Sequence, residues 1–269
     1  MERLDDFKSA GQGRSLDDIL TNGYSLDAMA AISRGFNILG RDIGSYLGFF
    51  VLSFIISFVM GLIPILSIIV GLIVSPALNA GYSYYLKGYL KDDTSEFSNF
   101  FNGFKSPQIW QLFLVHLISQ LIIGAVALVL IIIICGTTIM QYADEILSLS
   151  NPANISRNQE IAETLMASGL VVGILISVLI ALCLALFWVL ASQFVVFREL
   201  TFWDALEASR KIVMKKFFSY LGWAIVWLII ILVSALPCGL GLLFTIPAFM
   251  LSTYALYMQV TGDEEVLNQ

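Results

Sequence analysis

Polar side chains inside apolar stretches are the places where this chain could carry chemistry, and they are few. His116 is the only histidine. It lies about eight residues into an apolar stretch, and Ser119 and Gln120 at i+3 and i+4 share its helical face. Asn79 and Gln193 lie at a similar depth in two other apolar stretches. The five residues predict a polar pocket suited to a lipid headgroup or a small polar ligand. Alternatively, the same groups only hydrogen-bond between helices.

A second group of candidate residues is basic and comes directly before a later apolar stretch. It consists of Arg210, Lys211, Lys215 and Lys216. Such a cluster can hold anionic lipid. It can equally be a solvated basic edge that fixes the orientation of the protein in the membrane.

Complete catalytic and metal-binding sets are missing from the sequence. A lone histidine cannot form a Ser-His-Asp triad, and no HExxH, GxSxG or P-loop motif occurs. Cys135, Cys183 and Cys238 are widely spaced and predict neither a metal site nor a disulfide framework. We therefore expect no enzyme activity, cofactor, metal or nucleic-acid partner. The expected partners are membrane lipids and an unidentified protein.

Composition determines which elements must position these residues. The chain has 269 residues, of which 58% are hydrophobic and only 13% charged. Several windows long enough to cross a bilayer contain no charge, and a bilayer-spanning helix needs about 20 apolar residues. The composition therefore predicts a polytopic helical membrane protein. Because no early apolar signal precedes it, the stretch that starts near Gly44 is expected both to target and to anchor the chain.

The order of polar and apolar stretches predicts an all-α bundle of six transmembrane helices, arranged as three hairpins with interfacial amphipathic helices between them. Single helices are expected over 44–63, 66–86 (kinked at Pro76), 109–135 and 167–197, followed by a final pair around the break at Pro237. The predicted parts are a cytosolic tail over 1–24, an interfacial helix over 25–43, hairpin 1 over 44–86, an interfacial helix over 92–105, hairpin 2 over 109–197 with an outer acidic linker over 136–166, an interfacial helix over 201–216, hairpin 3 over 217–257 and a cytosolic tail over 261–269.

Basic residues are distributed unevenly over this plan. With six spans, Arg157 is alone on one side and the other thirteen of the 14 lysines and arginines lie on the opposite side. The positive-inside rule then predicts a multi-pass protein of the cytoplasmic membrane with both termini in the cytoplasm.

Two further patterns concern symmetry and packing. Ser45-Tyr-Leu-Gly48 recurs as Ser219-Tyr-Leu-Gly222, each copy at the start of a predicted span, which indicates a parallel internal repeat. Small residues at four-residue steps predict close helix crossings, and they place the 167–197 helix at the centre of the bundle. They are Gly169, Gly173, Ser177, Ala181 and Ala185 in that helix, and Gly40, Gly44 and Gly48 in the first one.

Several short motifs resemble a group of uncharacterised bacterial six-helix integral-membrane proteins related to the membrane domain of glycerophosphoryl diester phosphodiesterases. They are Phe202-Trp-Asp-Ala-Leu-Glu-Ala-Ser209, then Phe217, Tyr220, Pro247 and Tyr254, and the stretch EFSNFFNGFKSPQIW from Glu96 to Trp110. The catalytic phosphodiesterase domain has no counterpart in this chain, so the resemblance implies a membrane domain without that activity.

Two hypotheses of function follow from the sequence. The first is a non-enzymatic accessory or scaffold protein of the bacterial cytoplasmic membrane that binds lipid or a partner protein. The alternative is a transporter or flippase that moves a small polar or lipid solute through the pocket around His116. A membrane-embedded enzyme ranks behind both.

Overall fold

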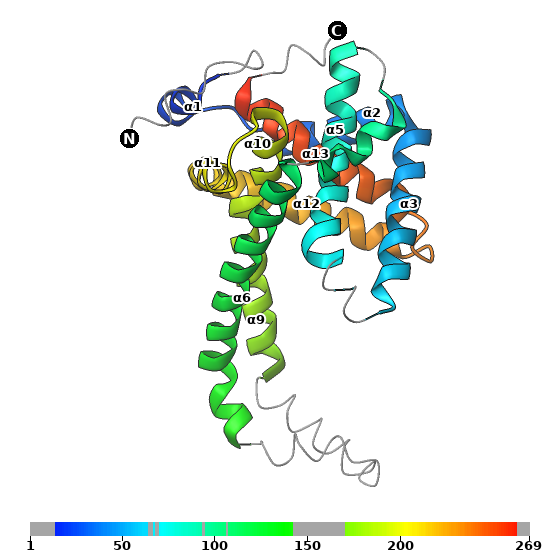
Figure 1. Ribbon diagram of the computed structural model, residues 1–269. Coiled ribbons are helices and arrows are strands. Elements are labelled where there is room, and N and C mark those ends of the chain that lie inside the picture. The colour runs from blue at the N-terminus through cyan, green and yellow to red at the C-terminus, as the bar shows by residue number, and fades with distance from the viewer. Residues whose placement is uncertain are drawn as a thin grey trace. The chain divides into compact units, whose positions relative to one another are not determined.

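A computed structural model describes residues 14–63, 67, 70–92, 95–105, 107–141 and 170–262, and all regular elements among them are helical. They form two compact units. The first comprises residues up to Ile118 together with those from Leu186 onward, and the second comprises Ser119–Ala185. The helices of the first unit are α1 (Leu16–Asn22), α2 (Ala28–Arg41), α3 (Ile43–Gly61), η1 (Val70–Val74), α5 (Ser75–Asp92), η2 (Phe97–Phe104), the start of α6 (Gln108–Gln141), η4 (Leu186–Trp188), α10 (Ala191–Arg198), α11 (Phe202–Lys215), α12 (Phe217–Ala235) and α13 (Leu242–Thr261) (Figure 1).

Among the residues that the structure describes, five helical segments are long and apolar enough to cross a membrane, which gives the chain the character of a multi-pass membrane protein. They are Ile43–Gly61, Gln108–Ile133, Val171–Arg198, Phe217–Ala235 and Leu242–Thr261. In four of them most of the apolar surface faces outward, as lipid-facing helices require. The segment expected over 66–86 is not among the five, because a π-helical stretch precedes α5 and α5 itself carries polar residues to Asp92.

The centre of the first unit is α13. Every residue from Leu251 to Thr261 is buried, and the helix packs against α2, α12, α10 and α5. The sequence placed the 167–197 helix at the centre, and that prediction is wrong. Its first part, α9 (Leu170–Ala185), belongs to the second unit and is largely exposed, whereas only α10 at its end lies in the core of the first unit.

The contact between α13 and α2 depends on one glycine. A Cβ built at Gly35 would lie 2.5 Å from the Ala248 carbonyl oxygen and 2.9 Å from the Ser252 Cβ, so only glycine permits this approach. The close crossing predicted at Gly40, Gly44 and Gly48 is wrong, because Gly40 and Gly44 have nothing within 4 Å and Gly48 only a ring edge at 3.9 Å. Helix approach in the first unit therefore uses isolated glycines instead of the four-residue series.

Aromatic rings form a second packing centre around η2. The Phe100 ring is fully buried and stacks between those of Phe49 and Tyr85, with centroid distances of 4.2 and 4.1 Å. The sequence predicted an α-helix over 92–105 with its phenylalanines at headgroup depth. Instead, α5 continues to Asp92 and η2 is a 3₁₀-helix. The rings share a face as expected, but several of them pack onto α3 and α5.

The second unit consists of the rest of α6 and α9. On α9, Gly173 and Ser177 are buried while their large apolar neighbours are exposed, so the small-residue face of this helix is the enclosed one. Helix α6 extends to Gln141, beyond the predicted end at 135. The remainder of the predicted acidic linker lies outside the described residues.

Candidate functional site

Three of the five predicted pocket residues lie in the first unit, on three different helices. Gln193 is buried in α10, where its Oε1 accepts from the Ser83 hydroxyl at 2.8 Å and its Nε2 donates to Thr253 Oγ1 at 3.1 Å. Asn79 is exposed on α5, and His116 is half-buried on α6. Gln193 thus ties α5, α10 and α13 together through two residues that the sequence analysis did not single out.

The two other predicted pocket residues belong to the second unit. Ser119 is buried there and Gln120 is exposed. Within the described part of the chain, no three histidine, cysteine or acidic residues are grouped as a metal site would require.

The four predicted anionic-lipid residues lie on the last turns of α11 and at its end, and Glu207 engages two of them. Arg210 donates to both Glu207 carboxylate oxygens at 2.8–3.0 Å, and Lys211 Nζ lies 3.4 Å from the same group. The hydrogen bonds from Arg210 lower the pKa of Glu207 below its ordinary value. Lys215 is exposed, and Lys216 Nζ lies 5.3 Å from the centre of the Tyr24 ring.

Helix α11 begins and ends where the sequence predicts. The Thr201 side chain caps its N-terminus by accepting from the Asp204 amide at 3.3 Å. The inward face carries small and branched apolar residues, among them Ala205, Ile212 and Val213, which are fully buried. The outward face carries Glu207 and Arg210, so the amphipathic pattern of the sequence corresponds to the observed burial.

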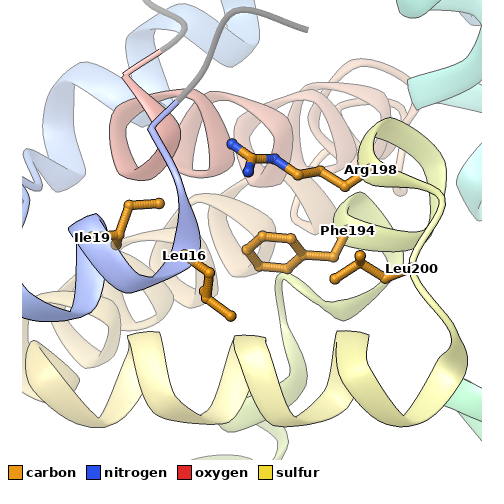
Figure 2. Close-up of a pocket in the computed structure, with 5 residues that line it drawn as sticks. All are labelled: Leu16, Ile19, Phe194, Arg198 and Leu200. Atoms are coloured by element: carbon orange, nitrogen blue, oxygen red, sulfur yellow. The ribbon is translucent and has the colours of Figure 1, made fainter. Parts of the chain in front are cut away.

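A site that sequence reasoning missed lies where α1 meets α10 (Figure 2). A small apolar pocket there is lined by Leu16, Ile19, Phe194, Arg198 and Leu200. Ile19 is fully buried although α1 has only seven residues. Ser15 caps the N-terminus of α1, because its Oγ accepts from the Asp18 amide at 3.2 Å.

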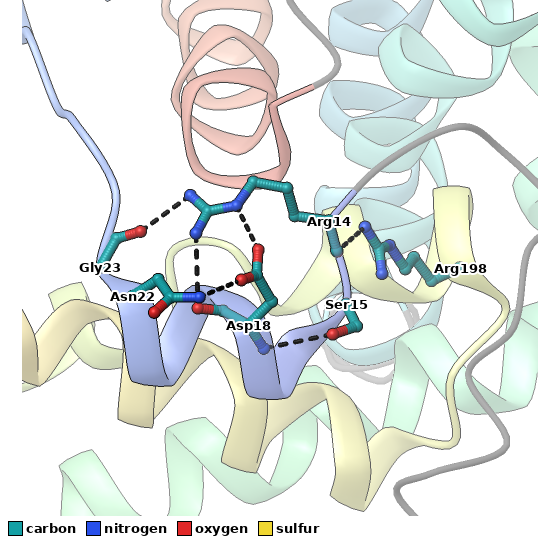
Figure 3. A network of polar contacts seen from close by, with 6 residues as sticks. All are labelled: Arg14, Ser15, Asp18, Asn22, Gly23 and Arg198. Carbon is teal, nitrogen blue, oxygen red and sulfur yellow. Dashed lines mark hydrogen bonds and ion pairs between the residues drawn. The ribbon is translucent and has the colours of Figure 1, made fainter.

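Arg14 and Arg198 hold this segment in place (Figure 3). Arg14 pairs with Asp18 and donates to the Gly23 carbonyl at 2.8 Å, while Arg198 donates to the Arg14 carbonyl at 2.8 Å. The Arg14 amide donates to the Thr261 carbonyl at 2.8 Å, which satisfies an end carbonyl of α13. Residues 14–24, which the sequence analysis assigned to a cytosolic tail, are held in place by packing and by these bonds. Residues 1–13 lie outside the described part.

Gln259 makes a second contact between α13 and the N-terminal part of the described chain, at Asp27. Its Oε1 accepts from the Asp27 amide at 2.8 Å, and its Nε2 donates to the Asp27 carbonyl at 3.1 Å. A glutamine in the last turn of the final apolar helix was the available sequence signal. Its partner could not be identified, because 232 residues separate the two.

The helices and their exposed apolar faces define the protein as an all-helical, multi-pass membrane protein. A family model described as "Protein of unknown function (DUF975)" matches residues 40–264, and the chain belongs to that family. The match carries no link to the phosphodiesterase membrane domain. No curated protein and no solved structure matches the chain. Helix α1 and most of α2 precede the matched region.

Proposed function

We propose that this protein is a non-enzymatic accessory or scaffold protein of the bacterial cytoplasmic membrane, which acts by binding lipid or a partner protein. Kinship with the phosphodiesterase membrane domain is part of the same proposal and brings no activity with it. The proposed form is six crossings in three hairpins, with both termini in the cytoplasm.

Contacts between helix ends support the even number of crossings. Asp42, just before α3, accepts a hydrogen bond from Tyr85 of α5, so the first hairpin returns to its starting side. The Phe202 amide, which follows α10, donates to Gln111 Oε1 near the start of α6 at 2.7 Å, which closes the second hairpin. The Arg14–Thr261 bond brings the two ends of the described chain together. With five crossings, Arg14 and Thr261 would lie on opposite sides of the membrane. With η1 and α5 as a sixth crossing, both residues lie on the same side.

The internal repeat is supported by matching burial. Tyr46 and Tyr220, the second residues of the two Ser-Tyr-Leu-Gly copies, are both buried at the start of a span. The returning helices each bury a proline, Pro76 and Pro247. The tyrosine and the proline are thus enclosed in both copies, which supports the proposed repeat.

The observation that carries the scaffold proposal is the bonding of Gln193. A transport pathway needs polar groups that face a passage, whereas Gln193 uses its carbonyl and its amide to join α5 and α13. Its neighbours on α10 are buried and apolar, namely Ala191, Phe194, Val195 and Val196. Hydrogen bonding between helices is the alternative to the polar pocket that the sequence analysis gave for Gln193.

A lipid-scrambling assay tests the proposal against the flippase alternative. The full chain is reconstituted into vesicles that contain tail-labelled fluorescent phosphatidylglycerol, and dithionite is added outside. We expect the same partial loss of fluorescence as in protein-free vesicles, and complete loss would overturn the proposal. If wild type scrambles lipid and Gln193→Leu, still folded by its melting curve, does not, the alternative is correct.

A second arm tests binding directly. The tagged full chain is extracted from its native membrane with surrounding lipid, and the material is quantified by mass spectrometry. The proposal requires a near-equimolar protein partner or a lipid class enriched over the bulk membrane. A composition equal to bulk lipid, with no partner, would count against it.

A further inference from the structure

Helix α11 has both of its ends at one membrane boundary. It follows the candidate span that ends at Arg198 and precedes the one that starts at Phe217. The Phe202–Gln111 bond ties its first residue to the start of a third span. A 14-residue helix is about 21 Å long. With both ends at the same depth, it must lie close to the membrane plane.

Two large apolar side chains are exposed on the otherwise charged outward face of α11. Trp203 is 60% exposed and Met214, eleven residues later on the same face, is 56% exposed. Phe218 follows at the start of α12 and is 84% exposed. Aromatic rings are favoured at headgroup depth, where an apolar body and a polar edge are both accommodated.

Charge on this helix has the sign that an anionic surface attracts. Residues 202–216 contain four basic residues and two acidic ones, a net charge of 4 − 2 = +2. Glu207 offsets Arg210 and Lys211, while Lys215 is exposed next to Met214. Lysine and arginine near an anionic leaflet each contribute to binding through its surface potential.

We propose that this outward face, consisting of Trp203, Arg210, Lys211, Met214, Lys215 and Phe218, lies in the headgroup layer of the bilayer and binds anionic phospholipid. The inference rests on the proposed function and names the partner of the basic cluster. Continuity selects the bilayer as the occupant, because the exposed apolar stripe runs on from Phe218 into the outward face of α12 at Ile225, Leu228 and Ile229. A protein partner at this face would have to displace lipid from the adjoining span.

Depth-dependent fluorescence quenching tests the position of Trp203. Full-length protein and Trp203→Phe are reconstituted with phosphatidylcholine brominated either near the headgroup or near the chain ends. The difference in fluorescence between wild type and Trp203→Phe is the emission of Trp203. We expect the shallow bromines to quench this emission at least twofold more than the deep ones. Equal insensitivity to both lipids would overturn the proposal, and it would place a protein, a second copy or water on this face. Trp227→Phe, which removes a buried indole, is the matched control.

Two charge variants with opposite expected signs test the lipid class. Spin-labelled phosphatidylglycerol and phosphatidylcholine are compared for association with the full chain in phosphatidylcholine vesicles. Lys215→Gln should lower the preference for phosphatidylglycerol about fivefold. Glu207→Gln should raise it, because Arg210 and Lys211 lose the carboxylate that offsets them. A fall in both variants would indicate structural damage alone and overturn the inference. Scrambling by wild type would overturn the proposed function while leaving this result in place.

Discussion

Ser252 is the residue on which three helices converge. Its hydroxyl oxygen accepts from the indole nitrogens of Trp223 at 2.8 Å and Trp227 at 3.1 Å, and its Cβ faces Gly35. Ser252→Ala leaves two buried donors without an acceptor. A buried donor without an acceptor costs about 1–3 kcal/mol in water-soluble proteins and less in membrane proteins. For the two donors together we expect the free energy of unfolding to fall by about 2 kcal/mol. The measurement is unfolding of the detergent-solubilised protein.

Thr245→Val is the control for this prediction. The Thr245 hydroxyl bonds only the Gly241 carbonyl of its own helix, so its removal should change stability by less than about 1 kcal/mol. Equal losses in both variants would mean that the two indole bonds contribute nothing specific.

Asp42 gives the stability a predictable pH dependence. Burial alone would raise its pKa, but hydrogen bonds from Tyr85 and Ser45 outweigh burial and lower the pKa below 3.8. The carboxylate therefore stabilises the fold fully above the unfolded pKa, and this contribution is lost as the pH falls through the lower folded value. Asp42→Asn should melt below wild type at neutral pH, and the difference should shrink on acidification. A gap that is constant down to about pH 3 would contradict the assignment.

At the scale of elements, the α2–α13 contact provides a matched pair of glycines. Gly35→Ala drives a methyl group into the Ala248 carbonyl and should cost about 2 kcal/mol or more. Gly40→Ala on the same helix meets nothing within 4 Å and should gain about 0.5–1 kcal/mol from helix propensity. Melting of the two variants in detergent should therefore move in opposite directions. The same direction for both would mean that α2 does not pack on α13 as described.

The same contact shows where sequence reasoning succeeds and where it stops. The order of polar and apolar stretches was enough to predict α11 and the span after it, because this pattern depends on neighbours in the chain. The position of Gly35 against Ser252 depends on residues 217 apart, and nothing local distinguishes Gly35 from Gly40. The four-residue glycine series was the stronger local signal, and it marks no close crossing in the first unit.

The candidate site was predictable to a similar degree. Gln193 was identified as a polar residue inside an apolar stretch, and hydrogen bonding between helices was one of its two predicted roles. Its partners, Ser83 and Thr253, are common residues in apolar helices and carry no distinguishing pattern. Arg14 and Arg198 looked like ordinary topology determinants, because their shared contact exists only after the two ends of the chain meet.

At the scale of the whole molecule, the decisive quantity is the side on which each loop lies. Single cysteines at Leu62, Lys105 and Lys215, with native Cys238 as a fourth site, are labelled in intact cells by a membrane-impermeant maleimide. The three introduced cysteines are placed in a background without native cysteines, and the fourth variant retains Cys238 alone. All four positions lie in exposed segments. Six crossings predict labelling at 62 and 238 from outside, and protection at 105 and 215 until the membrane is opened.

Position 105 separates the two possible counts. If η1 and α5 do not cross, Lys105→Cys shares the side of Leu62→Cys, and everything that follows is inverted, so that Cys238 becomes protected. The bond between Arg14 and Thr261 would then join residues on opposite faces of a membrane, which is physically impossible. Labelling of Lys105→Cys from outside would therefore refute the three-hairpin arrangement. It would also refute the position of α11 at the cytoplasmic leaflet. The contacts between helix ends support opposite sides for Lys105→Cys and Leu62→Cys, and the proposed orientation adds that Leu62→Cys is the one labelled from outside.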